Sequence, residues 1–164
     1  MTIELRRLEL GDLDAIESIE RLSYRTPWSR SMFTSELTKP SSLSLGAIDV
    51  DGSLIGYLVL SKQVDAWHVM NLAVAPDHRR RGIASALLTH LLDSTRVDAE
   101  RGYTLEVRVS NVGAIELYER FGFQARGVRR GYYTDNREDA VIMWRDPVDP
   151  AVDPAEAGST RKTG

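Results

Sequence analysis

The feature that most constrains this chain is the stretch 71–92, where an apolar segment passes through a basic turn into an amphipathic helix. Three consecutive arginines and Gly82 occupy the turn, and apolar residues then recur along one face of the helix. A strand that delivers such a turn to a helix N-terminus builds an anion site, because unpaired backbone N–H groups and the positive end of the helix dipole converge there. The sequence therefore predicts a ligand that carries phosphate.

The turn has the pattern Arg79-Arg80-Arg81-Gly82-Ile83-Ala84. Its glycine and alanine leave the backbone uncovered, so that a diphosphate can reach the amides, while the arginines supply positive charge. The same residues also fit a solvated basic turn in front of an ordinary amphipathic helix. The turn lacks the Lys-Ser/Thr pair of a P-loop, and the sequence has no G-x-G-x-x-G dinucleotide motif.

Length and charge limit the class of protein. At 164 residues the chain fits one domain, which we expect to cover residues 1–146, followed by a disordered tail at 147–164. The net charge of -3 argues against a general nucleic-acid binder, because affinity for the phosphate backbone normally rests on a basic surface. The absence of cysteine excludes disulfides, thiolate metal sites and thiol nucleophiles. A charged N-terminus and the lack of a long apolar run predict a cytoplasmic protein without membrane contact.

The first part of the chain is expected to form a strand, two helices and a hairpin. Residues 2–9 alternate as in a strand, and Asp12 and Ser29 are the expected N-caps of two helices, the second ending before Pro40. Asp51-Gly52 joins the strand-like runs 43–50 and 54–62, which predicts an antiparallel hairpin. The first helix is expected to carry Leu13, Ile16, Ile19 and Leu22 on one side.

The remainder alternates strands and helices. Strands are expected at 67–74 and 103–109, each followed by a helix, and the second helix starts at Asn111 and ends at Gly122. Closing strands at 123–130 and 139–144 flank a loop at 131–138. This order predicts an α/β (α+β) fold with a mixed, mostly antiparallel central sheet flanked by helices.

With its flanks included, the basic turn resembles the acetyl-CoA motif of the GCN5-related N-acetyltransferase (GNAT) superfamily: a strand, then [QR]-x-x-G-x-[GA], then a helix. Two later segments, 105–123 and 129–143, resemble the RimI-like subfamily, which acetylates the N-terminal alanine of a small-subunit ribosomal protein (S-eighteen). The likeness spans residues 3–144. It implies a single-domain GNAT fold, acetyl-CoA as co-substrate and no metal.

The resemblance also implies how the chain holds acetyl-CoA. The strand before the turn runs its backbone beside the pantetheine arm and supplies an N–H group to the thioester carbonyl. The pyrophosphate lies on the turn, and Asn111 helps to hold the cofactor while it also caps a helix. The expected cofactor-binding residues are Leu72, Ala73, Val74, Arg79, Arg80, Arg81, Gly82, Ile83, Ala84, Ser85 and Asn111.

Glu106 is a carboxylate on the polar side of a strand otherwise made of leucine and valine. Its residue type and position fit either a solvated side chain paired with Arg108 or a general base. A peptide α-amine has a pKa of about 7.7–8.0, so a carboxylate, or a water that it holds, needs only to take a proton as the amine attacks. The resemblance to RimI-like enzymes implies the second role.

Tyr118 lies two helical turns beyond Asn111 and shares its helix face. Core packing beside Ile115 and Phe121 is the ordinary interpretation of such a tyrosine. A phenol near a thioester can also donate a proton to the departing CoA thiolate, and the resemblance implies this role.

The loop and closing strand near residue 131 are aromatic and charged, which suits a peptide ammonium group as well as an ordinary loop. In the resemblance this segment lies on the substrate side, through Tyr132, Tyr133, Arg137, Glu138 and Asp139. His68 and Trp67, on the strand before the basic turn, receive no role.

These expectations describe an acetyl-CoA-dependent N-acetyltransferase that acts on a protein N-terminus, which the resemblance implies to be that of a ribosomal protein. Two alternatives stay open. One keeps the fold and transfers the acetyl group to a lysine side chain, a polyamine or an aminoglycoside. The other is a non-catalytic acyl-CoA-binding module. The sequence predicts neither the oligomeric state nor the range of N-termini that are accepted.

Overall fold

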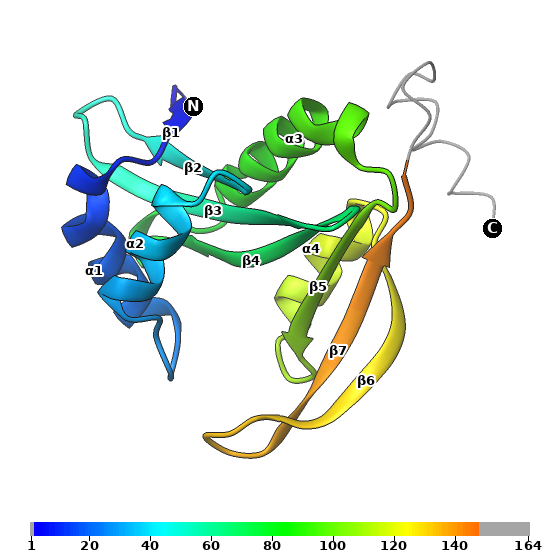
Figure 1. The fold of residues 1–164 in the computed structure, drawn as a ribbon. Coiled ribbons are helices and arrows are strands. Elements are labelled where there is room, and N and C mark those ends of the chain that lie inside the picture. Colours follow the sequence, from blue (N-terminus) through cyan, green and yellow to red (C-terminus); the bar gives the residue numbers. More distant parts are fainter. Residues whose placement is uncertain (1, 148–164) are drawn as a thin grey trace. The chain divides into compact units, whose positions relative to one another are not determined.

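The structure is a computed structural model, and it describes residues 2–147. One seven-stranded sheet has the order β1-β2-β3-β4-β5-β7-β6. Strands β4 and β5 are parallel, while the pairs β1–β2, β2–β3, β5–β7 and β6–β7 are antiparallel. The strands are β1 Glu4–Arg7, β2 Ser42–Ile48, β3 Leu54–Gln63, β4 Ala66–Val74, β5 Tyr103–Arg108, β6 Gln124–Tyr133 and β7 Glu138–Arg145, and the α-helices are α1 Leu13–Ser23, α2 Arg30–Thr38, α3 Ile83–Thr95 and α4 Val112–Arg120 (Figure 1). The predicted mixed, mostly antiparallel sheet with helices is confirmed.

The chain divides into two compact units. The first comprises the residues up to Gln63 together with Val69–Asp93, and the second comprises Val64–His68 together with the residues from Ser94 onward. Strand β4 therefore contributes to both units, and each unit is described by itself. The disordered tail is predicted at 147–164, and all of it except Pro147 lies outside the described residues.

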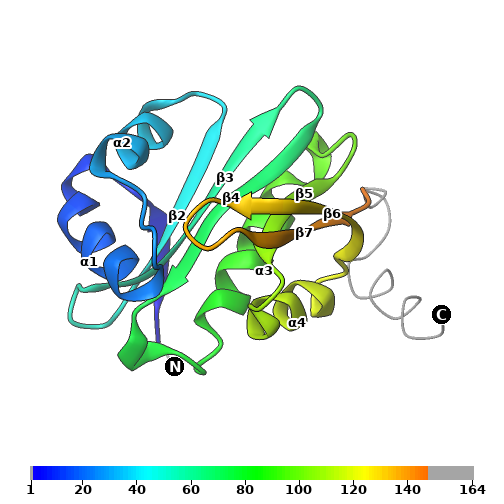
Figure 2. The same ribbon diagram turned by 90° about the horizontal axis from the view of Figure 1, so that it is seen from below.

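In the first unit, the predicted hairpin forms with Gly52 in the left-handed region, at φ 88°, and the Gly52 N–H bonds the Asp49 carbonyl at 2.9 Å. Helices α1 and α2 pack together beside strands β2 and β3 (Figure 2). The core that they bury contains Leu13, Ile16, Ile19, Phe33, Tyr57 and Val59. Helix α3 lies on the other face of β3, because a Cβ added to Gly56 would come within 3.2 Å of the Ile83 side chain.

One expectation for α1 is wrong. Leu22 is 68% exposed, because it lies about two and a half helical turns beyond Leu13 and so points the opposite way. Glu20 takes the buried position instead and is 1% exposed. Asp12 is the N-cap of α1, as expected, but its side chain makes no cap bond to the helix, because its carboxylate accepts from Arg6 and from the Glu9 N–H.

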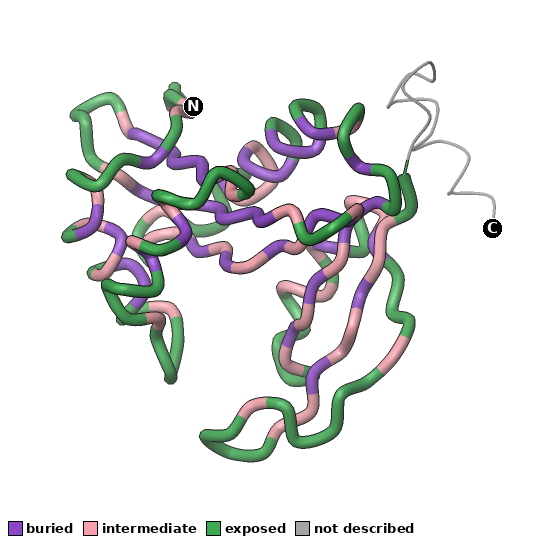
Figure 3. Tube along the Cα trace, in the orientation of Figure 1, coloured by how far each residue is buried: buried purple, intermediate pink, exposed green. Residues whose placement is uncertain are grey.

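In the second unit, β5 alternates as predicted: Tyr103, Leu105 and Val107 are buried, while Glu106 and Arg108 are partly exposed. Asn111 caps α4, its Oδ1 accepting from the Ala114 N–H at 3.2 Å. The sheet ends at β6, most of whose residues are exposed (Figure 3).

The loop expected at 131–138 is shorter than predicted. Strand β6 continues through Tyr133, so that only residues 134–137 separate it from β7. Tyr132 and Tyr133 favour an extended backbone, and the chain reverses over the next residues with Arg137 at a left-handed φ of 59°. Within residues 2–147 no helix is long and apolar enough to cross a membrane.

Candidate active site

The basic turn, residues 79–82, leads into α3 with the geometry of an anion site. Arg80 and Gly82 both have left-handed backbones, at φ 63° and 77°, and α3 begins at Ile83. The first N–H groups of a helix have no intrahelical acceptor, so those of Ile83, Ala84 and Ser85 point out of the helix end. The first turn of α3 contains no acidic residue, and a Cβ at Gly82 would meet no atom within 4 Å. The turn therefore offers backbone donors to an anion.

The three arginines of the turn are not equivalent. Arg79 donates from Nε to the Val74 carbonyl at 3.0 Å and from Nη2 to the Ser23 hydroxyl at 3.1 Å. Its guanidinium thereby ties the end of β4 to α1. Arg80 and Arg81 are exposed, so they supply the charge that the turn presents to solvent.

Alternation along β4 decides which of its peptide groups can face a ligand. The Ala75 N–H bonds the Ile55 carbonyl of β3 at 2.8 Å, so Ala73 also turns its peptide groups toward β3. Leu72 and Val74 face the opposite edge, where their carbonyls accept from the Tyr24 hydroxyl and from Arg79. Of the three strand residues predicted to contact the cofactor through backbone N–H groups, Leu72 and Val74 have theirs on this edge.

Glu106 forms a close pair with His68, which sequence reasoning left without a role. The two side chains project from the parallel strands β4 and β5, where His68 lies in register with Thr104, and the His68 Nε2 to Glu106 Oε2 distance is 2.5 Å. Both are largely but not fully buried, with side-chain exposures of 19% and 13%. The hydrogen bond from His68 lowers the pKa of Glu106 below its ordinary value, although burial opposes the shift. Glu106 is therefore ionised at neutral pH.

Arg108, the other partner considered for Glu106, binds elsewhere. Its guanidinium makes two 3.0 Å bonds to Asp135 and a 3.2 Å bond to Glu138, and it lies 4.0 Å from the centre of the Tyr133 ring. Glu138 also accepts from the Ser110 N–H at 2.8 Å. The bonds to Ser110 are the main cause that lowers the pKa of Glu138 to about 2, with Arg108 and Asn136 adding to the effect. Hydrogen bonds and ion pairs from Arg108 thus hold the turn between β6 and β7 against β5.

The remaining predicted residues of the second unit differ in their burial and in their hydrogen-bond partners. Tyr118 is buried in α4 and its ring lies 5.6 Å from that of Phe123. Asn111 uses Oδ1 for the helix cap, which leaves its amide N–H groups outside that bond. Tyr132 is 43% exposed and meets Tyr133 edge-on, whereas Asp139 accepts from the Gly131 N–H at 2.8 Å and so stabilises the hairpin. Burial raises the pKa of Tyr133 to about 12.

The structure therefore groups the predicted residues in two sets. Leu72 to Ser85 lie in the first unit, and Glu106, Asn111, Tyr118 and the β6–β7 residues lie in the second. Sequence reasoning missed His68 because a lone histidine beside an apolar run carries no local signal. Only the pairing of β4 with β5 brings it to Glu106.

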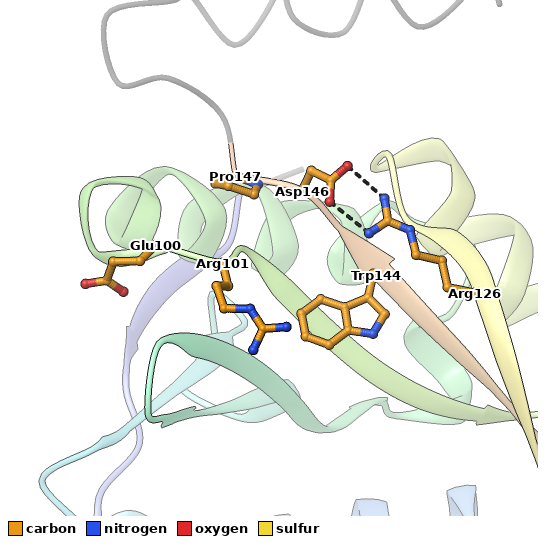
Figure 4. Close-up of a pocket in the computed structure, with 6 residues that line it drawn as sticks. All are labelled: Glu100, Arg101, Arg126, Trp144, Asp146 and Pro147. Carbon is orange, nitrogen blue, oxygen red and sulfur yellow. Dashed lines mark hydrogen bonds and ion pairs between the residues drawn. The ribbon is translucent and has the colours of Figure 1, made fainter.

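An open pocket of about 500 Å³ at the end of β7 belongs to neither set. It is lined by Glu100, Arg101, Arg126, Trp144, Asp146 and Pro147 (Figure 4). Arg126 makes two bonds to Asp146, at 2.8 and 2.7 Å, and Arg101 lies 5.5 Å from the centre of the Trp144 ring. Because both guanidinium groups already have partners and no predicted residue lines the pocket, we assign it no role.

Comparison with known proteins identifies the class to which this fold and these residues belong. The profile of the Acetyltransferase (GNAT) family matches residues 13–123. The chain belongs to the GNAT family of acetyltransferases, and it is an N-acetyltransferase.

Two curated relatives and one solved structure narrow the similarity. The [ribosomal protein bS18]-alanine N-acetyltransferase of Escherichia coli (strain K12) is 38% identical over 138 residues, which cover 83% of this chain and 92% of that protein. An N-alpha-acetyltransferase of Saccharolobus solfataricus is 37% identical over 155 residues, covering 86% of this chain and 91% of that protein. The crystal structure of the ribosomal-protein-S18-alanine N-acetyltransferase from Escherichia coli matches with a TM-score of 0.82 and 34% identity, covering 93% of this chain and 99% of that one.

Proposed function

We propose that this enzyme transfers the acetyl group of acetyl-CoA to the α-amine of the N-terminal alanine of ribosomal protein bS18, in the cytoplasm. The observation that carries the proposal is the ionised, partly exposed carboxylate of Glu106, on the strand that follows the anion-binding helix α3 in the chain. The similarity to the Escherichia coli enzyme, across nearly its whole length, supports the choice of acceptor.

The residues of the first unit suit the donor. The N–H groups of Ile83, Ala84 and Ser85 and the exposed Arg80 and Arg81 match a pyrophosphate in number and charge. Leu72 and Val74 have backbone N–H groups on the β4 edge that does not face β3, which suits the amide-rich pantetheine arm. In the second unit, the amide of Asn111 is a further donor. Acetyl-CoA supplies the acetyl group in activated form, as a thioester.

Two side chains of the second unit supply the proton transfers. Glu106 takes a proton from the attacking amine, directly or through a water, and it can do so because it remains ionised at neutral pH. Tyr118 donates its phenolic proton to the departing sulfur. The acetyl group passes directly to the amine, without a covalent enzyme intermediate.

Substitution kinetics test these roles. Glu106→Gln and Tyr118→Phe should each lower kcat by roughly 10²–10⁴-fold, the usual contribution of general acid–base catalysis, while calorimetry still detects acetyl-CoA binding. Wild-type turnover in both variants would refute the assignment.

A panel of acceptors tests the substrate. Turnover should be highest with a peptide that carries the bS18 N-terminus and should vanish when its α-amine is blocked. Faster acetylation of a lysine side chain, a polyamine or an aminoglycoside would contradict the proposed acceptor. Binding of acetyl-CoA with no turnover on any amine would indicate a non-catalytic binding module.

A further inference from the structure

His68 makes a hydrogen bond to one of the two carboxylate oxygens of Glu106, the proposed base. The two side chains approach across the parallel strands β4 and β5, at 2.5 Å between His68 Nε2 and Glu106 Oε2. An ionised carboxylate has no proton to donate and can act only as a hydrogen-bond acceptor. The His68 Nε2 atom must therefore carry the proton and donate the hydrogen bond. This geometry fixes the imidazole as the donor and Oε2 as the acceptor.

The two oxygens of Glu106 are consequently different. Oε2 is held by His68, whereas Oε1 makes no hydrogen bond to another side chain within residues 2–147. A glutamate has three rotatable side-chain bonds, and a base on such a chain loses catalytic power when its oxygen is not held near the proton that it accepts. A hydrogen bond from a neighbouring strand removes most of that freedom.

The other groups around Glu106 do not hold its carboxylate. Across the sheet its neighbour on β7 is Ile142, which has no charge. Arg129 and Tyr133 on β6 interact with Glu106 electrostatically, without a hydrogen bond to its carboxylate. Arg108, on β5 itself, is bound to Asp135 and Glu138. His68 is therefore the hydrogen-bonding neighbour of this carboxylate in the described part of the chain.

We propose that His68 is the positioning residue of the catalytic base: it binds Oε2 of Glu106 and leaves Oε1 to take the proton from the substrate amine. This inference rests on the proposed role of Glu106. His68 also stabilises the ionised carboxylate, so the base stays competent when the pH falls.

Two substitutions separate the hydrogen bond from the space that the imidazole fills. His68→Leu removes the donor, and kcat should fall roughly 10–100-fold, less than the loss on removing the base itself. His68→Gln places an amide N–H where Nε2 was, and it should restore kcat to within about fivefold of wild type, as expected when one donor replaces another. His90→Leu, at an exposed position on α3, is the matched control and should leave kcat unchanged. The affinity for acetyl-CoA should be the same in all three variants.

A carbon-13 NMR titration of the Glu106 carboxyl gives a readout that does not depend on turnover. The pKa of Glu106 should rise in His68→Leu, because the hydrogen bond that lowers it is lost, and His68→Gln should show a smaller rise. An unchanged pKa of Glu106 in His68→Leu would overturn the inference.

A double substitution distinguishes the failure of this inference from the failure of the proposed function. If His68 acts through Glu106, His68→Leu should cost nothing further in the Glu106→Gln background. Full activity of Glu106→Gln would refute the base itself. A defective Glu106→Gln beside a fully active His68→Leu would refute only the positioning role, and a larger loss in His68→Leu than in Glu106→Gln would make the imidazole the base.

Discussion

Glu20 shows how a single buried residue can join several segments of the first unit. Its Oε1 accepts from the Tyr57 hydroxyl at 2.5 Å and from the Asn71 amide at 2.9 Å, and its Oε2 accepts from the Trp28 N–H at 2.9 Å. Helix α1, strands β3 and β4 and the segment before α2 thus meet at one carboxylate. Burial, reinforced by the neighbouring charge of Glu20, raises the pKa of Tyr57, so its phenol remains a donor.

Removing this carboxylate should be costly. Glu20→Ala leaves two buried donors, on Tyr57 and Asn71, and the partly buried Trp28 N–H without an acceptor, and it should lower the free energy of unfolding by about 3 kcal/mol or more, because each unsatisfied buried group costs about 1–3 kcal/mol. Urea unfolding measures the loss. Glu17→Ala on the same helix is the control: Glu17 pairs with the half-exposed Arg30 at 2.6 Å, and a surface pair of this kind is worth at most about 1 kcal/mol. Equal losses in the two variants would show that the network does not stabilise the fold.

Among the secondary-structure elements, the β6–β7 hairpin is held by the charge of Arg108 on β5 and by the backbone N–H of Ser110, in the segment that leads into α4. Arg108 holds Asp135 and Glu138, and Glu138 holds the Ser110 N–H. The pKa of Glu138 falls from its ordinary 4.5 to about 2 in the folded protein. A carboxylate with a lowered pKa stabilises the fold fully above its unfolded value and loses that contribution as the pH falls toward its folded value.

A pH series on Glu138→Gln tests this link. The variant should unfold at lower urea concentration than wild type near pH 7, where the wild-type carboxylate is ionised. The difference in free energy of unfolding should shrink as the pH is lowered from about 4.5 to about 2, because the wild-type side chain is then protonated as well. A difference that stays constant over this window would show that the charge of Glu138 does not fasten the hairpin.

For the whole molecule, the binding of coenzyme A should raise the melting temperature Tm. A ligand that binds only the folded chain stabilises it by about 2.7 kcal/mol at 100 times its Kd. For a protein of this size, that corresponds to a rise in Tm of about 5–10 °C. Coenzyme A should produce such a rise in wild type, and a smaller one at the same concentration in an Arg80→Ala, Arg81→Ala double variant.

The matched control for that experiment is Arg21→Ala, which removes an exposed arginine of α1 that lies 4.0 Å from Glu17. Its response to coenzyme A should equal that of wild type. If the double variant also responds fully, the charge of the basic turn does not contribute to binding.

Local signals explain why much of the fold could be predicted from the sequence. The hairpin at Asp51-Gly52, the caps at Ser29 and Asn111 and the alternation along β5 each depend on a few neighbouring residues, and all four are confirmed. The burial of Glu20 and the exposure of Leu22 depend on which face of α1 meets the sheet. That information lies in residues distant along the chain.

The candidate site divides in the same way. Glu106 and the basic turn carry recognisable local patterns, so they could be singled out before the structure. The partner of Glu106 could not, because Arg108 is nearer in sequence but His68 is nearer in space. The three arginines of the basic turn are likewise indistinguishable in the sequence, because they are consecutive and of one residue type. Only the structure shows that Arg79 is bound to the end of β4.

The ion pairs of Arg108 with Asp135 and Glu138 allow the turn between β6 and β7 to be changed by engineering. Because Asp135 and Glu138 hold the turn to β5, the exposed positions 132, 134 and 137 can be randomised in a library without removing the bonds that keep the hairpin in place. Position 137 should favour Gly or Asn, since its backbone is left-handed. Such a library would vary the sequence of the turn and leave the folding of the chain intact.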